Sequence, residues 1–375
     1  MRIEWIATED ALDACIDRWR QHEYVGFDTE FIRVRTFYPA IALYQVAAAG
    51  ECTLIDPLAV AGFVGFRRWL TDPATTLVMH ACSEDLEVIQ HHLGVLPAAI
   101  YDTQLAASFV GRDHSLGYQA LVRRELQVEL QKGETRSDWL RRPLSPEQRR
   151  YAAEDVDYLP PLREGLQQQL RQRGRLAWAA QEMHRLRDGA ALRRAGDYYT
   201  GVRDAWRLQP RQLAVFRAVC LWREETARRR DRPRGHIVGD DVLLDIARRG
   251  VARGRDLAAL LSPAAGERYA DELLAIIEAA LELPAAQLPV ALPGPLSPAQ
   301  ADLLKALRAR VVELAQRLDM AETTLASRRH LETFVRNLDG PPPAQGDAAL
   351  PHWRAEVVLP ELEDVVARWR QTRSG

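Results

Sequence analysis

The stretch 25–31, with the sequence VGFDTEF, constrains the fold of this chain more than any other. Its aromatic and β-branched residues predict a β-strand, and the two-residue period of a strand puts Asp28 and Glu30 on one face. Two carboxylates side by side on a strand repel each other, so the pattern favours a cation between them. Such oxygen ligands suit hard divalent ions. A solvated strand face can carry the same two acids, so the pair alone does not establish a metal site.

The composition is that of an ordinary folded protein. A chain of 375 residues predicts two or three domains. The apolar fraction of 47% and the charged fraction of 27% are typical of a soluble protein, and the net charge of −2 excludes a uniformly basic nucleic-acid coat. Only Lys132 and Lys305 are lysines, so arginine dominates the basic residues. Arginine suits phosphate, but a compositional bias of the source genome explains the excess equally well.

Cysteine usage and hydropathy bear on the compartment. The four cysteines are widely spaced and form no C-x-x-C pair, so neither a disulfide framework nor a zinc ribbon is expected. The N-terminal stretch has acidic residues by Glu9 and Asp10 and no apolar run, so we expect no secretory signal. No uncharged apolar stretch approaches the roughly 20 residues of a membrane span. We therefore expect a cytoplasmic monomer with no membrane partner.

The following stretches predict a sheet. Two extended runs, 41–47 and 51–56, are separated by a short Ala-Gly link, which predicts a hairpin and makes the first three strands an antiparallel meander. A helix is expected near 63–70. Residues 75–80 then predict a fourth strand that is buried on both faces, and Tyr101 begins a further element.

A third acidic residue follows the fourth predicted strand. Ser83 is in position to cap a helix whose first turn holds Glu84 and Asp85. Asp85 thus lies just past the carboxyl end of a strand, where open α/β sheets place their ligands. The helix dipole explains the same carboxylates without a ligand. A further short helix is expected at 115–122.

A fourth acidic residue lies on a longer predicted helix. The run 145–148 (SPEQ) supplies an N-cap, a proline at the first helical position and a capping-box glutamine, so we expect a helix from there to about Leu170. Within it Tyr151 and Asp155 are four residues apart and share a face. Such pairs are common on solvated helix surfaces, so this one does not by itself indicate a site.

Together these segments resemble a known family. The segments 27–31 (FDTEF), 80–86 (HACSEDL) and 151–155 (YAAED) resemble, in order and spacing, the three exonuclease motifs of the tyrosine branch of the DEDD superfamily. The run 135–145 (TRSDWLRRPLS) resembles the bacterial ribonuclease D family in particular. The resemblance implies an RNase H-like α/β fold with a mixed sheet flanked by helices. It also implies metal-dependent 3′→5′ hydrolysis of RNA with release of nucleoside 5′-monophosphates.

The resemblance also assigns roles to residues. It implies that Asp28, Glu30, Asp85 and Asp155 hold two divalent cations, Mg²⁺ or Mn²⁺, whose charge the four carboxylates balance. Asp28 would bridge both ions, Glu30 and Asp155 would complete the first site, and Asp85 would hold the second, partly through water. Tyr151 would orient the attacking water, because a phenol with a pKa of about 10 is a poor base at neutral pH. All five residues are candidate catalytic residues.

The C-terminal half contains an internal repeat. From about residue 208 the pattern is wholly helical, and at an offset of 88 residues Pro210 aligns with Pro298 and Asp231 with Asp319. We infer two copies of one helical domain. This half resembles the paired helicase-and-RNase-D C-terminal (HRDC) domains, the first copy more closely than the second. We predict an exonuclease domain at 1–200, an HRDC domain at 208–288, a proline-rich linker at 289–297 and an HRDC-like domain at 298–375.

The resemblance implies RNA 3′ ends, tRNA precursors among them, as the substrate. Arginines 228–230, with Arg232 and Arg234, would contact phosphate, although a solvated helix face carries such a run equally well. Recognition of the 2′-hydroxyl is expected from the backbone near 29–31, Gln45 or His80, which the sequence does not rank. An exonuclease acting mainly on DNA is the alternative enzyme. A non-catalytic RNA-binding scaffold is disfavoured, because all four acids and the tyrosine are present.

Overall fold

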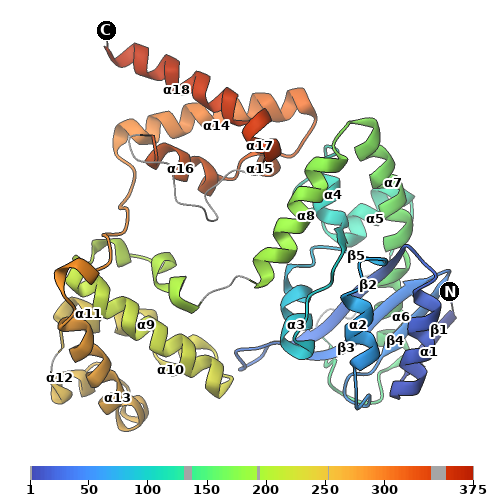
Figure 1. The fold of residues 1–375 in the computed structure, drawn as a ribbon, viewed down its shortest axis with the longest axis horizontal. Coiled ribbons are helices and arrows are strands. Elements are labelled where there is room, and N and C mark those ends of the chain that lie inside the picture. Colours follow the sequence, from blue (N-terminus) through green and yellow to red (C-terminus); the bar gives the residue numbers. More distant parts are fainter. Residues whose placement is uncertain (1, 131–136, 192–194, 252, 339–351, 375) are drawn as a thin grey trace. The chain divides into compact units, whose positions relative to one another are not determined.

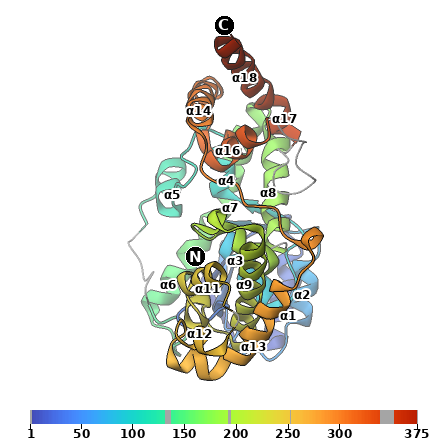
Figure 2. The same cartoon turned by 90° about the vertical axis from the view of Figure 1, so that its left-hand side faces the viewer.

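The computed structural model describes residues 2–130, 137–191, 195–251, 253–338 and 352–374 (Figure 1). Residues 135 and 136 of the run that resembles ribonuclease D lie outside these ranges. Backbone contacts divide the chain into two compact units (Figure 2). Unit 1 comprises Met1–Ile32, Ile41–Ala191 and Leu296–Gly375, and unit 2 comprises Arg33–Ala40 and Leu192–Pro295. Among the helices described, none has the length and apolar character needed to span a bilayer.

Unit 1 is built on a six-stranded mixed sheet with the order β1-β4-β3-β2-β5-β6. Its strands are β1 (Arg2–Ile6), β2 (Tyr24–Ile32), β3 (Ala40–Ala48), β4 (Glu51–Ile55), β5 (Thr76–Met79) and β6 (Ile100–Asp102). β3 and β4 pair antiparallel, which confirms the predicted hairpin. The pairs β1–β4, β2–β5 and β5–β6 are parallel. Strand β1 was not predicted, because its alternating charged residues resemble an exposed terminus.

Helices flank the sheet, and those nearest to β2 lie on both of its faces. Up to residue 191 the helices of unit 1 are α1 (Glu9–Trp19), α2 (Val64–Leu70), α3 (Ser83–Leu93), α4 (Thr103–Ser108), α5 (Tyr118–Leu126), α6 (Pro146–Asp157), α7 (Leu159–Gln172) and α8 (Leu176–Ala191). On one face Phe27 stacks on Phe66 of α2, with ring centroids 6.4 Å apart. On the other face a Cβ atom at Gly26 would lie 2.5 Å from the carbonyl oxygen of Val156. Only glycine allows α6 to approach β2 this closely.

The structure corrects three helix boundaries. The helix predicted from 145 to about 170 is two helices, because Pro160 and Pro161 have no N–H to continue the first one and α7 begins at Leu159. The capping box of Ser145 and Gln148 is confirmed, with both reciprocal hydrogen bonds present. Helix α3 begins at Ser83, so the residue in the cap position is Cys82. The helix expected at 115–122 instead runs from Tyr118 to Leu126.

The sequence repeat is also a repeat of helix boundaries. The first copy contains α9 (Pro210–Arg230), α10 (Arg234–Ile237), α11 (Asp240–Arg249), α12 (Gly254–Ala258) and α13 (Pro263–Leu281). The second contains α14 (Pro298–Leu318), α15 (Glu322–Leu325), α16 (Arg328–Arg336), α17 (His352–Val357) and α18 (Leu359–Ser374). Helices α9 and α14, and likewise α10 and α15, begin and end 88 positions apart. Each long helix is followed by an aspartate in the left-handed region, Asp231 with φ 47° and Asp319 with φ 49°.

The two copies belong to different units. The second copy packs within unit 1, where Trp353 stacks on Trp178 of α8 at 5.3 Å and Arg354 pairs with Glu182 at 2.8 Å. The first copy forms unit 2 together with the segment that connects β2 to β3. There the backbone N–H groups of Phe37 and Tyr38 both donate to Asp231, at 2.9 Å.

Candidate active site

Strand β2 presents two acids on the face that α6 covers. The strand alternates as predicted: Phe27 and Thr29 are buried, whereas Asp28 and Glu30 are partly exposed. Gly26 lies on the same face as the acids and touches α6. The face of β2 that carries the acids therefore meets the helix that carries the fourth acid.

Helix α6 supplies Tyr151 and Asp155. Burial raises the pKa of the Asp155 carboxyl, and a hydrogen bond from the Tyr151 hydroxyl group opposes this rise, as their shared helix face predicts. The tyrosine ring packs against Trp139, with ring centroids 6.0 Å apart. Burial, followed by the charges of Asp155 and Glu30, raises the pKa of the Tyr151 phenol far above its ordinary value. The phenol is thus a hydrogen-bond donor at neutral pH.

Helix α3 supplies Asp85, which is only 8% exposed. Its Oδ1 accepts a hydrogen bond from the hydroxyl group of Thr29. The turn before α3 places Ala81 at φ 56°, a conformation that non-glycine residues rarely adopt. The buried Asp102 accepts hydrogen bonds from the N–H of Cys82 at 2.9 Å and of Ala81 at 3.3 Å, which fixes this turn. Thr29 and Asp102 received no role from the sequence.

The four acids repel one another. The pKa of Asp28 is raised well above its ordinary value by burial and then by the charges of Asp85, Asp155 and Glu30. Burial and the charges of Asp155 and Asp85 raise the pKa of Glu30 to about 8. Burial raises the pKa of Asp155 to about 7 and that of Asp85 to about 6. The structure thus brings all four predicted acids within electrostatic reach, and no basic group is among the causes of these shifts.

The donor set fits a hard divalent cation, although it is not arranged as a finished coordination shell. Among the described residues, no three His, Cys, Asp or Glu side chains are close enough together to hold an ion as they stand. The Asp85 carboxylate accepts a hydrogen bond from Thr29, and that of Asp155 accepts one from Tyr151. Carboxylate oxygens are what Mg²⁺ and Mn²⁺ prefer, and a cation would relieve the repulsion.

Comparison with known proteins identifies the family. Residues 3–171 match the model of a 3′-5′ exonuclease family, and residues 212–277 match that of the HRDC domain. Ribonuclease D of Pseudomonas paraeruginosa is 42% identical, with all of this chain and 96% of that protein covered. This chain belongs to the ribonuclease D family. Ribonuclease D of Escherichia coli K12 is 32% identical over 99% of this chain and its full length, and the crystal structure of E. coli RNase D superposes with a TM-score of 0.90.

Family membership makes the chain a hydrolase. Its exonuclease domain carries a mixed sheet with flanking helices, as expected, and is followed by an HRDC helical domain. The crystal structure of E. coli RNase D covers 98% of this chain and 99% of its own, at 32% identity. The assignment of the second helical copy to the HRDC family and the predicted domain boundaries stay predictions.

Gln45 and His80, two candidates for contact with a 2′-hydroxyl group, are surrounded by other parts of the protein. Gln45 on β3 is 0% exposed, and neither end of its amide has a hydrogen-bond partner. Both ring nitrogens of His80 are engaged, Nδ1 with the Thr103 hydroxyl at 2.9 Å and Nε2 with the Leu116 carbonyl at 3.1 Å. Contact of either side chain with a 2′-hydroxyl stays a prediction.

Gln45 does, however, lie next to β2, the strand that carries Asp28 and Glu30. The link between β2 and β3 is too short for a parallel crossover, so the strands run antiparallel. A Cβ atom at Gly26 would lie 3.3 Å from Cβ of Ala47, which makes these residues lateral neighbours. In an antiparallel pair, two residues forward on β2 correspond to two residues back on β3. Gln45 is therefore the lateral neighbour of Asp28, on the same face of the sheet. The sequence could not assign this contact, because it depends on strand register.

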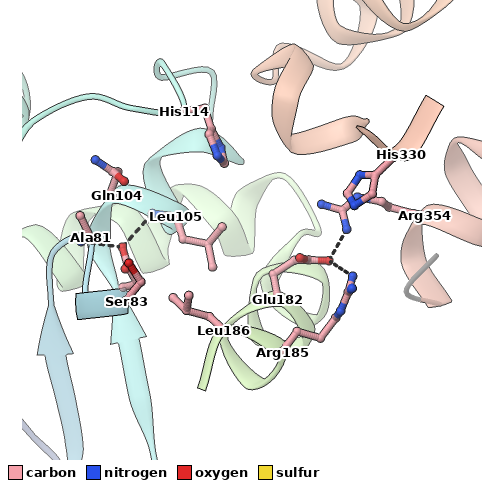
Figure 3. Close-up of a pocket in the computed structure, with 11 residues that line it drawn as sticks. Ala81, Ser83, Gln104, Leu105, His114, Glu182, Arg185, Leu186, His330 and Arg354 are labelled. Carbon is pink, nitrogen blue, oxygen red and sulfur yellow. Dashed lines mark hydrogen bonds and ion pairs between the residues drawn. The ribbon is translucent and has the colours of Figure 1, made fainter. Parts of the chain in front are cut away.

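A cavity of about 360 Å³ lies beside the turn that precedes α3 (Figure 3). Figure 3 shows Arg185 and Arg354 both directed at Glu182, with N–O distances of 3.8 and 2.8 Å. Gln104 donates to the Leu116 carbonyl at 3.1 Å, and His114 bonds to Thr324 at 3.2 Å. These polar groups are paired within the protein, so we assign the cavity no ligand.

Proposed function

We propose that this ribonuclease D family member trims RNA from its 3′ ends and releases nucleoside 5′-monophosphates, with tRNA precursors among its substrates. The observation that carries the proposal is the cluster of four mutually repelling carboxylates around β2. The sequence similarity supports the choice of RNA, since the relatives are named ribonuclease D. The E. coli structure is described as an exoribonuclease involved in structured RNA processing.

Asp28, Glu30, Asp85 and Asp155 would hold two divalent cations, Mg²⁺ or Mn²⁺. When bound, such ions stabilise the negative charge that develops on the attacking and leaving oxygens of a phosphodiester. We assign Asp28 to both ions, because it is the acid whose pKa all three others raise, which indicates a central position. Glu30 and Asp155 would complete one site and Asp85 the other.

Tyr151 would position the attacking water by a hydrogen bond. Its phenol stays protonated at neutral pH, so it does not remove the proton itself. The contact with Trp139 limits the rotation of the ring. The role of Tyr151 is therefore orientation of the nucleophile.

The first helical copy would contribute phosphate contacts, but not through all five predicted arginines. Arg228 and Arg234 both bind the buried Glu224, the former at 2.8 Å. Both guanidinium groups are thus held by one carboxylate within unit 2. We therefore expect the exposed side chains of Arg229, Arg230 and Arg232 to contact the RNA backbone.

The test is a cleavage assay on an RNA with a 3′ overhang and on its DNA counterpart, with Mg²⁺ or Mn²⁺. We expect stepwise shortening of the RNA that EDTA abolishes, and no shortening by the Asp28→Ala variant. Cleavage in EDTA, or by the variant, would remove the two-metal mechanism. DNA degraded as fast as RNA would establish the alternative exonuclease, and RNA binding without cleavage would establish a scaffold.

A further inference from the structure

A second cavity lies at the start of strands β5 and β6. Its volume is about 350 Å³, which is in the range of small-molecule sites. Thr76 and Ile100, the first residues of the two strands, line it, as do residues of α7 and α8. We call it the Tyr101 pocket, after the tyrosine of β6 that lines it. It belongs entirely to unit 1.

Two buried polar atoms at this pocket have no hydrogen-bond partner in the part of the chain that the structure describes. They are the hydroxyl oxygen of Tyr101 and Nε of Arg163. Tyr101 is 8% exposed, so its hydroxyl group lacks both a protein partner and open solvent. Burial of an unpaired polar group is unfavourable, and natural proteins rarely keep two such groups together without a ligand or a bound water.

The charges of the Tyr101 pocket favour an anion. The guanidinium of Arg163 lies over the ring of Tyr24 at 3.9 Å and 5.7 Å from the ring centroid of Tyr101. Among the described residues, no carboxylate is within ion-pair distance of Arg163. Arg187 also lines the pocket, bound to the Ala98 carbonyl and to Asp188 at 2.8 Å.

The remaining lining adds donors and an apolar wall, but no acid. Gln167 and His184 can donate, and among the described residues neither Asp nor Glu lines the cavity. Leu170, Leu176 and Met183 add apolar groups to the lining. A lining with both donors and apolar groups matches a phosphate group that is attached to a less polar body.

We propose that the Tyr101 pocket binds a phosphomonoester at a site separate from the catalytic acids. Arg163 and the Tyr101 hydroxyl group donate to the phosphate oxygens. The pocket lies at the beginning of β5, where Thr76 pairs with Tyr24. Asp28 is four residues further along β2, about 13 Å away at the rise of a strand. A ligand here would therefore leave the catalytic acids open to RNA.

The test is calorimetric titration in EDTA, which keeps the catalytic acids free of metal. The probes are inorganic phosphate, a nucleoside 5′-monophosphate and the corresponding nucleoside; the choice of mononucleotide rests on the proposed function. We expect saturable binding of at least one phosphate probe with Kd below about 1 mM. The nucleoside should not bind. A mononucleotide that binds at least tenfold more tightly than phosphate would identify the reaction product as the ligand, and equal affinity would identify free phosphate.

Variants separate the pocket from other sites. Tyr101→Phe removes only the unpaired hydroxyl group, so we expect an unchanged or higher melting temperature and affinity at least about tenfold weaker. Arg163→Gln should lose binding, whereas Arg171→Gln, an exposed arginine of the same helix, should retain it. Asp28→Asn should also retain it, which separates this site from the catalytic one. Any of three results would overturn the proposal: no binding by the wild type, full affinity in Tyr101→Phe, or nucleoside binding equal to that of the mononucleotide. Ordered water would then be the partner of the two polar atoms. Because no step requires cleavage, the result stands whether or not RNA is hydrolysed.

Discussion

The hydroxyl group of Thr29 donates a hydrogen bond to Oδ1 of Asp85, so the strand that carries two of the proposed catalytic acids also holds a third. This bond opposes the effect of burial, which raises the pKa of the Asp85 carboxyl to about 6. Thr29 itself is buried, with 5% exposure, and lies on the face of β2 opposite Asp28. A residue between the two motif acids thus helps to keep Asp85 ionised.

Thr29→Val should impair activity most at low pH. The valine keeps the shape but cannot donate, so the pKa of Asp85 rises further and protons compete better with the metal. We expect a loss of about 5- to 10-fold in kcat/KM at pH 6.5 and a much smaller loss at pH 8.5. Thr29→Ser, which keeps the hydroxyl group, is the matched control. Equal losses at both pH values would show that Thr29 acts only through packing.

Asp28→Asn should stabilise the metal-free protein at high pH. The folded-state pKa values of the four acids are raised, so their favourable contribution to stability is complete below about pH 4 and is lost as pH rises, through about 6 to 8 for Asp85, Asp155 and Glu30. Removing one charge should raise the free energy of unfolding by about 0.5–2 kcal/mol at pH 8 and change it little at pH 4.5. Urea unfolding in EDTA measures the free energy of unfolding at each pH.

Asp28→Asn should have the opposite effect on stability, relative to the wild type, when Mg²⁺ is present. Mg²⁺ should stabilise the wild type at pH 8 and leave Asp28→Asn nearly unchanged, because the acid assigned to both ions is gone. A metal-free variant that is less stable than the wild type at pH 8 would contradict the repulsion inferred among the four acids.

The sequence predicted what depends on local pattern. The alternation of β2, the capping box of Ser145 and the repeat at 88 residues all follow from residue spacing, and the structure confirms each. Pro160 and Pro161 mark the break at Tyr158 in the sequence. Because the pattern on both sides of it is helical, one continuous helix was predicted instead of two.

Contacts between distant segments could not be predicted in this way. The bond between Thr29 and Asp85 joins residues 56 positions apart, and Asp102 fixes a turn about 20 residues earlier in the chain. The placement of Gln45 next to Asp28 needs the register of β2 on β3. Such contacts are set by tertiary packing, which leaves no periodic signal in a single sequence.

Gln45→Met should separate function from stability. The amide of Gln45 is buried and unpartnered beside Asp28, so its replacement by an apolar side chain of similar volume costs the fold little or stabilises it. If the amide orients the Asp28 carboxylate when metal is bound, activity falls by about tenfold and the Mg²⁺ concentration for half-maximal rate rises. A variant with normal activity but lower stability would make Gln45 a purely structural residue.

Tyr151→Phe should reduce kcat while leaving the metal requirement and KM nearly unchanged. The phenylalanine keeps the ring packed against Trp139 but cannot donate to the attacking water, and loss of one orienting hydrogen bond typically costs about 10²-fold in rate. Because the raised pKa keeps the phenol protonated, the hydroxyl group does not titrate within the working range. At high pH the rate of the variant should therefore follow that of the wild type at a lower level, whereas the acidic limb should move to higher pH, because Asp155 loses the hydrogen bond that lowers its pKa. Single-turnover rates from pH 6 to 9 test this: a full rate in the variant would remove Tyr151 from the proposed catalytic residues, and a rise of rate towards pH 9 that is lost only in the variant would make it a titrating base.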